Sequence, residues 1–147
     1  MAIEYTLYVD TDDPPLHMYG IMRACIGDES NAASTGSLAF SGDSLQGVVS
    51  VPDDLTRRFV SEDFSLDAQV QVILRLDKFE MERAQNSLAR CVSEIVRAGN
   101  DDMILLFNGE LVVLRRRAGD LVLREGFGIW TAERIALFGT PYRVGSV

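Results

Sequence analysis

One amphipathic segment, residues 79–98, most constrains what this chain can fold into. Its apolar positions recur at spacings of three and four: Met81, Ala84, Leu88, Cys91 and Ile95. This spacing draws a single apolar stripe along a helix, with charged residues on the opposite side. Gly99-Asn100 then ends the helix. A helix that is apolar on one side must bury that side, so the chain needs a second layer of secondary structure.

Two alternating segments indicate that this second layer is a sheet. In residues 3–10, the apolar side chains of Ile3, Tyr5, Leu7 and Val9 share one face of a strand. Residues 70–76 also alternate, with Val70, Val72, Leu74 and Leu76 on one face and more polar side chains on the other. A polar second face favours an antiparallel sheet that is covered on one side.

A further helix is predicted directly after the first strand. Asp12 and Asp13 precede Pro14-Pro15, and an aspartate cap followed by proline in the first turn is typical of a helix start. Apolar residues then recur at helical spacing, and Gly27 can close the helix. These apolar residues are Leu16, Tyr19, Met22 and Ile26.

The C-terminal third predicts a three-stranded meander and a short helix. Residues 102–107 and 110–116 flank Asn108-Gly109, the dipeptide that most strongly favours a hairpin turn. A turn at residues 118–120 leads into a third strand, and Thr131 can cap a helix over residues 132–138. Four aromatic residues near this helix are expected to pack it onto the sheet: Phe127, Trp130, Phe138 and Tyr142.

The middle of the chain carries weaker signals. Residues 28–37 are small and polar, which is typical of a loop, and residues 38–40 and 48–51 predict two short strands. Residues 52–67 show no assignable pattern. With no repeat or linker, we predict one domain over residues 1–147, of the α+β class. It is a two-layer fold with a mostly antiparallel sheet, two main helices on one face and a short C-terminal helix.

The net charge of −8 argues against nucleic acid as a partner, because neutralising phosphates requires an excess of Lys and Arg. The excess is uneven, since residues 1–67 hold twelve acidic and three basic side chains. An acidic surface of this kind can steer a basic protein into contact. It can also serve only to keep the protein soluble, and the composition does not distinguish the two roles.

The chain lacks the motifs of the common catalytic and metal sites. His17 is its single histidine, Cys25 and Cys91 lie outside metal or redox spacings, and both are expected to be buried thiols. Arg115-Arg116-Arg117 is expected to be a solvated strand end. We predict no enzyme activity, no cofactor and no metal. No apolar run approaches the ~20 residues of a membrane span, and no secretory signal is evident, so we expect a cytoplasmic protein without membrane contact.

Residues 1–7 and 104–116, together with Trp130 and Pro141-Tyr142-Arg143, resemble the Sit-type immunity proteins. These small bacterial proteins are associated with swarming-inhibition toxins and polymorphic toxin loci. The resemblance implies a non-catalytic protein that binds and neutralises a cognate protein toxin, and a basic nuclease-type toxin would complement the acidic charge. A homodimer is compatible with this role.

If the charge guides binding, the partner-binding residues are the acidic side chains of the first half: Asp10, Asp12, Asp13, Asp28, Glu29, Asp53, Asp54, Glu62 and Asp63. Two other function classes remain open at this point. A small-ligand or metal-dependent enzyme would need a concave pocket with converging polar groups. A homo-oligomeric adaptor would need an exposed apolar face.

Overall fold

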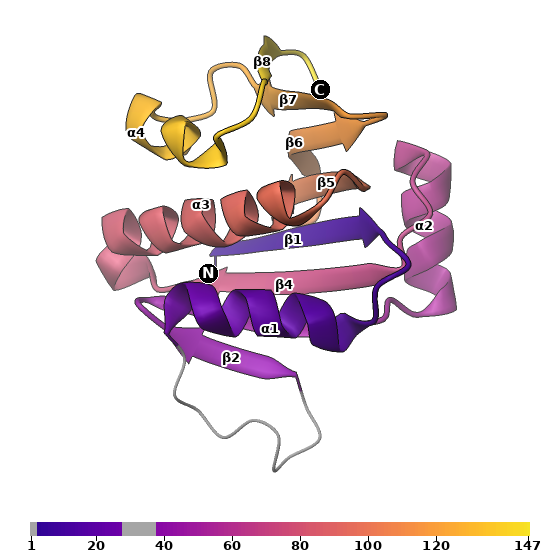
Figure 1. The fold of residues 1–147 in the computed structure, drawn as a ribbon, viewed down its shortest axis with the longest axis horizontal. Helices are drawn as coiled ribbons and strands as arrows, with labels where there is room; N and C mark the ends of the chain where they lie inside the picture. Colours follow the sequence, from indigo (N-terminus) through magenta and orange to yellow (C-terminus); the bar gives the residue numbers. More distant parts are fainter. Residues whose placement is uncertain (1–2, 28–37) are drawn as a thin grey trace.

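The computed structural model describes residues 3–27 and 38–147, and its strands form one eight-stranded sheet in the order β2-β3-β4-β1-β5-β6-β7-β8 (Figure 1). Neighbouring strands are antiparallel except for β7 and β8, which are parallel. The strands are β1 (Ile3–Asp10), β2 (Ala39–Gly42), β3 (Leu45–Ser50), β4 (Val70–Leu76), β5 (Asp102–Phe107), β6 (Leu111–Arg117), β7 (Asp120–Arg124) and β8 (Arg143–Gly145).

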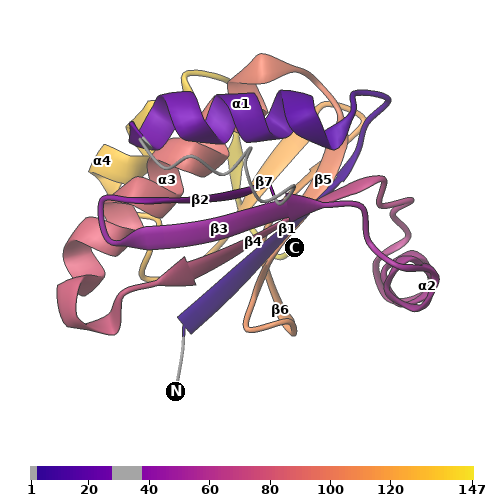
Figure 2. The same ribbon diagram turned by 90° about the horizontal axis from the view of Figure 1, so that it is seen from below.

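Helices α1 and α3 lie side by side on one face of this sheet, as predicted (Figures 1 and 2). The helical segments are α1 (Pro15–Ile26), α2 (Asp54–Phe64), α3 (Met81–Ala98) and α4 (Ala132–Ile135), with 3-10 turns η2 (Lys78–Glu80) and η3 (Ala136–Phe138). The α+β prediction is therefore confirmed. In the described residues, no helix is both long enough and apolar enough to cross a membrane.

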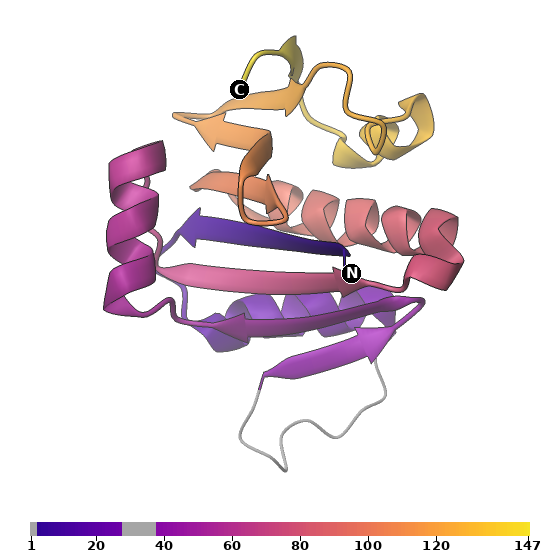
Figure 3. The same cartoon turned by 180° about the vertical axis from the view of Figure 1, so that it is seen from behind.

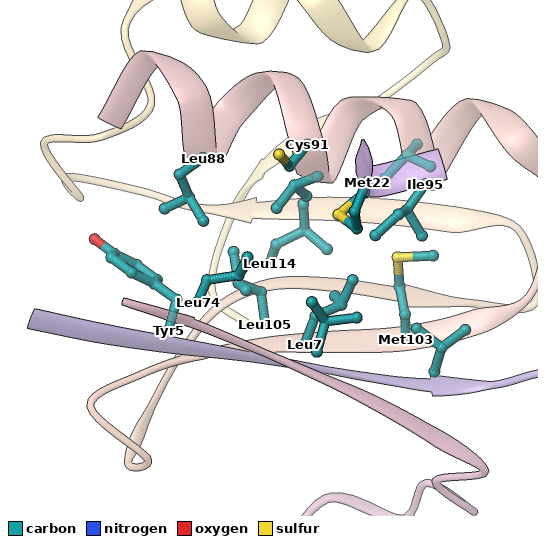
Figure 4. Packing of buried hydrophobic residues seen from close by; sticks show 14 of the residues in the cluster. Tyr5, Leu7, Met22, Leu74, Leu88, Cys91, Ile95, Met103, Leu105 and Leu114 are labelled. Atoms are coloured by element: carbon teal, nitrogen blue, oxygen red, sulfur yellow. The ribbon is translucent and has the colours of Figure 1, made fainter. Parts of the chain in front are cut away.

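The main core lies between the sheet and the two helices α1 and α3. Leu7 from β1, Leu105 from β5 and Leu88 from α3 are fully buried in it. Figure 4 shows these side chains interdigitating with Met22 of α1 and with Cys91 of α3. The stripe predicted for residues 79–98 is thus the buried side of α3, although the α-helix itself begins at Met81 after the 3-10 turn η2.

A second, smaller core lies on the opposite face of the sheet, under α2. Val60 of α2 is fully buried there against Tyr8, Ile104 and Leu106, which alternate with the residues of the main core. Figures 2 and 3 show α2 at one end of the sheet, on the side away from α1. The unassigned segment 52–67 therefore contains a helix whose single buried residue is Val60, too few for a recognisable stripe.

Three hairpin turns join neighbouring strands, and each has two successive residues with positive φ. Asn108 and Gly109 have φ values of 50° and 77°, which confirms the predicted turn. Asp43-Ser44 and Ala118-Gly119 adopt the same conformation. The turn between β2 and β3 lies at Asp43-Ser44, and both strands are longer than the predicted residues 38–40 and 48–51.

Two details of α1 differ from the prediction. The N-cap is Pro14, without any side-chain cap, so Asp12 and Asp13 precede the helix and do not cap it. Leu16 is 65% exposed, whereas Tyr19, Met22 and Ile26 are buried as predicted. Leu16 lies in the first turn of α1, and its side chain stays in solvent.

The C-terminal segment was predicted in part. Thr131 accepts a hydrogen bond from the Arg134 backbone N–H and caps α4. Trp130 donates its indole N–H to the Val113 carbonyl and packs against Phe138, which confirms their structural role. Tyr142 is instead exposed, and the short strand β8 that follows it was not predicted.

The expectation that Arg115-Arg116-Arg117 is a solvated strand end is wrong for Arg116, which is only 4% exposed. Its guanidinium donates to the carbonyls of Val96 and Asp101, both at 2.8 Å. Val96 lies in the last turn of α3, where carbonyls lack partners within the helix. Arg116 therefore caps the C-terminus of α3 from the neighbouring sheet.

We predict that Arg116→Met lowers the free energy of unfolding by about 1.5–3 kcal/mol, the value of hydrogen bonds to a charged group. Urea unfolding followed by circular dichroism measures this loss. Arg115→Met is the matched control, because Arg115 is only partly buried, and it should change stability by less than about 0.5 kcal/mol. Equal losses in both variants would show that Arg116 does not hold the end of α3.

Two glycines give predictions of opposite sign. A Cβ added at Gly47 would lie 2.2 Å from the ring of Phe40, its cross-strand partner, whereas a Cβ at Gly20 in α1 meets nothing within 4 Å. We expect Gly47→Ala to lower the free energy of unfolding by about 1–3 kcal/mol through overpacking. Gly20→Ala should raise it by about 0.5–1 kcal/mol through helix propensity. Thermal unfolding of both variants checks the two signs.

Candidate partner-binding surface

Carboxylates gather at the end of the sheet where β1 and β3 finish and where β4 and β5 begin. These four ends coincide because β1 is antiparallel to β4 and β5, and β3 is antiparallel to β4 (Figure 1). The strand ends and loops here, together with the start of α2, carry eight aspartates. We call them the acidic edge: Asp10, Asp12, Asp13, Asp53, Asp54, Asp67, Asp101 and Asp102.

Strand pairing brings the centre of the acidic edge together. Asp10, the last residue of β1, is the direct register partner of Asp102, the first residue of β5. On the other side of β1, the Gln69 backbone N–H donates to the Val9 carbonyl at 3.0 Å. This bond holds the segment of Asp67 beside the end of β1.

The electrostatics of Asp10 show that these carboxylates repel one another. Partial burial raises the pKa of Asp10, and the negative charges of Asp67, Asp102, Asp101 and Asp12 raise it further. The folded protein therefore keeps a set of like charges close together, at a cost in stability.

Three members of the acidic edge also have structural bonds. Asp53 accepts a hydrogen bond from the Thr56 backbone N–H at 2.7 Å, which caps α2 and lowers the pKa of Asp53. Asp67 pairs with Arg57 at 3.0 Å, and Asp102 accepts from the Ala118 backbone N–H. Asp12 and Asp13, in contrast, are exposed, and Asp13 lies 3.7 Å from the imidazole of His17.

The predicted partner-binding residues fall into three groups. The structure brings Asp10, Asp12, Asp13, Asp53 and Asp54 to one end of the sheet. Glu62 and Asp63 are exposed on the last turn of α2, while Asp28 and Glu29 lie outside the described residues. Whether any of them binds a partner stays a prediction.

Sequence reasoning missed Asp67, Asp101 and Asp102, which complete the acidic edge. Each lies just before or at the first residue of a strand that pairs with β1. Knowing that β4 and β5 both pair antiparallel with β1 would have identified them. The alternating pattern shows that these segments are strands, but it does not show which strands are neighbours.

Basic residues also reach this end, and most of them are engaged. Arg117 donates to the carbonyls of Phe64 and Ser65, which end α2. Arg57 is paired with Asp67, and Arg116 is buried. The carboxylates of the acidic edge therefore dominate its exposed charge.

A metal centre or a concave pocket with converging polar groups is what the enzyme alternative would need. Within residues 3–27 and 38–147, no group of three or more His, Cys, Asp or Glu side chains is arranged to hold a metal ion. A hollow of about 450 Å³ lies beside α3, but its arginines are already engaged: Arg83 and Arg90 by Asp43, and Arg134 by Asn86. The side chains that line the hollow are mostly polar, and several of them bond to one another.

The two cysteines lie next to each other between α1 and α3, which their separation in the sequence did not indicate. Cys91 is buried as predicted, whereas Cys25 is only half-buried. A hydrogen bond between the thiols lowers the pKa of Cys25, and that bond together with burial raises the pKa of Cys91. Both are free thiols in the main core.

A family model described as SitI3-like matches residues 3–134, which is most of the chain. The chain belongs to the SitI3-like family. This family assignment confirms the resemblance to Sit-type immunity proteins and places the SitI3-like chain among the immunity proteins of toxin–immunity systems. All eight residues of the acidic edge lie within the matched region. No curated protein and no solved structure matches the chain.

The repulsion at Asp10 gives a prediction for this SitI3-like protein. Asp10→Asn should raise Tm by about 1–3 °C at pH 7, because it removes one of the repelling charges. The raised pKa means that the folded state binds this proton more tightly than the unfolded chain does. The stabilisation by that proton is lost as pH rises through the folded-state pKa.

The gain in Tm from Asp10→Asn should therefore shrink as the pH is lowered and the wild-type carboxyl becomes protonated. Thermal unfolding from pH 7 down to pH 4 measures this difference. Glu110→Gln, an exposed carboxylate on the β5–β6 turn at the opposite end of the sheet, is the control and should show no gain. A lower Tm for Asp10→Asn at pH 7 would contradict the repulsion.

Proposed function

We propose that this protein is an immunity protein that binds a cognate toxin and neutralises it by covering a functional surface of the toxin, without catalysis. The family assignment supports the general role. The acidic edge is the observation that carries the mechanism, since the fold gathers carboxylates from separate loops at one end of the sheet and tolerates their repulsion.

The partner that fits this surface is a basic protein. Complementary charge accelerates association and selects the partner, and paired charges at the rim contribute less to the affinity itself. Toxins that act on nucleic acid are basic because they bind phosphates. We therefore expect the partner to be a nuclease-type toxin in the cytoplasm. Neutralisation by covering its surface needs no cofactor or metal.

The proposal treats residues 1–147 as one binding domain. A homodimer is compatible with it, provided that the acidic edge stays accessible in each copy. Light scattering of the free protein and of the complex gives the stoichiometry.

The proposed function is tested by capture and rescue. The immobilised protein is incubated with host extract at low salt, and proteins eluted by high salt are identified by mass spectrometry. Each basic candidate is then expressed in recipient cells, with and without this protein. The proposal expects one candidate that stops growth alone and is tolerated in the presence of this protein. If no captured protein is toxic and rescued, the proposed function is wrong.

A pair of charge variants tests the role of the acidic edge in that complex. Asp12→Asn/Asp13→Asn removes two exposed carboxylates that do not cap α1. We expect it to slow association with the toxin by roughly tenfold at low salt and to reduce the salt dependence. Stopped-flow fluorescence measures the association rate.

The matched control for that pair is Glu80→Gln/Glu110→Gln. It changes the net charge equally, but both residues are exposed at the opposite end of the sheet. Its association rate should stay close to that of the wild type. Equal slowing by both double variants would show that only the total charge matters and would refute the acidic edge as the contact surface.

A further inference from the structure

The outer face of α2 carries an apolar pair that the protein itself does not cover. Leu55 is 75% exposed and Phe59 is 40% exposed. They are four residues apart, so they are neighbours on one side of the helix. The ring of Phe59 also contacts that of Phe64, with centroids 5.7 Å apart. We call Leu55 and Phe59 the α2 stripe.

The helix that presents the α2 stripe is fixed in place. Asp53 caps its first turn, Val60 is buried in the second core, and Arg117 donates to carbonyls at its C-terminal end. Arg57 pairs with Asp67 in the following loop. Among the described elements, none lies outside α2 in Figures 2 and 3. Binding through the α2 stripe would therefore cost little conformational entropy, because the helix is already fixed.

Charge surrounds the α2 stripe in a pattern typical of protein interfaces. Asp54 precedes it, and Glu62 and Asp63 both follow Phe59 by about one helical turn, all exposed. Arg58 lies on the same side of the helix and adds one positive charge. An aromatic residue within a charged rim is typical of interfaces, in which a buried centre supplies most of the affinity, and Leu55 enlarges that apolar centre.

We propose that the α2 stripe is the anchor of the toxin complex and inserts into a groove with an apolar floor and a basic rim on the cognate toxin. This inference rests on the proposed function. Residues four apart on one helix face are the contacts by which a helix fills a groove. Charge complementarity favours this occupant, since α2 adjoins the acidic edge and its own rim is mainly acidic.

The same charge disfavours a second copy of this chain as the occupant. Packing two α2 helices face to face would bring Asp54, Glu62 and Asp63 of one copy against those of the other. Such like-charge contacts oppose association.

The test uses the full chain and the toxin identified by rescue. Leu55→Ser/Phe59→Ser should weaken the Kd by about 30-fold or more, as expected for hot-spot residues, and should keep this loss at high salt. The control is Phe79→Ser/Val144→Ser, which removes a phenylalanine that is 84% exposed and a valine that is 51% exposed, both outside α2 and the acidic edge. Its Kd should match that of the wild type. Calorimetry gives the Kd values, and circular dichroism checks that each variant is folded.

A second measurement serves if Phe59→Ser unfolds the helix. A photoreactive benzoylphenylalanine replaces Leu55 in one sample and Phe79 in another. Irradiation with the toxin should crosslink the chain at position 55 and not at position 79. Crosslinking at 79 alone, or between two copies of this chain at 55, would overturn the proposal.

The outcomes separate this inference from the proposed function. If Leu55→Ser/Phe59→Ser binds and protects like the wild type, the α2 stripe is not the anchor, while the immunity role stands. If the wild type binds no toxin, both proposals fail together. Loss of binding by the α2 variant alone, with the control intact, supports the inference.

Discussion

The hydrogen bonding of β1 along both edges is the constraint on which the rest of the structure depends. Seven residues of β1 pair with β4, and six pair with β5. Because its side chains alternate, Leu7 and Val9 face α1 and α3, while Thr6 and Tyr8 face the second core and the open side of the sheet. The strand therefore joins both cores, and the position of its last residue, Asp10, fixes which loops lie together.

That placement concentrates charge where it costs stability. Asp10 is desolvated beside other carboxylates, and an apolar or neutral residue there would lower the repulsion. Natural proteins keep a stability cost of this kind where function requires it, and the proposed contact with a toxin is such a function. The exposed α2 stripe lies beside this end of the sheet. Two features that cost stability, repelling carboxylates and exposed apolar side chains, therefore occur on neighbouring surfaces.

Much of the fold was predictable because its elements carry strong local patterns. The apolar stripe of α3, the alternation of β1 and β4, and the Asn108-Gly109 turn each reflect one periodicity or one turn conformation. Helix α2 was not predictable, since Val60 is its single fully buried residue and its apolar residues Leu55 and Phe59 are exposed. Arg116 was misjudged because its role as the cap of α3 depends on a strand that lies beside the helix end only in three dimensions. For the same reason, only five of the eight residues of the acidic edge were predicted. Asp67, Asp101 and Asp102 join Asp10 only through strand order.

Hydrogen–deuterium exchange of the protein alone and saturated with its toxin tests most directly whether the acidic edge and α2 form the interface. We predict slower exchange of the backbone amides in α2 and in the loops around residues 11–14, 66–69 and 99–102. Exchange on the outer side of α1 and around β8 should not change. Protection confined to α1, α3 or β8, with α2 and the acidic edge unaffected, would place the interface elsewhere and contradict the account.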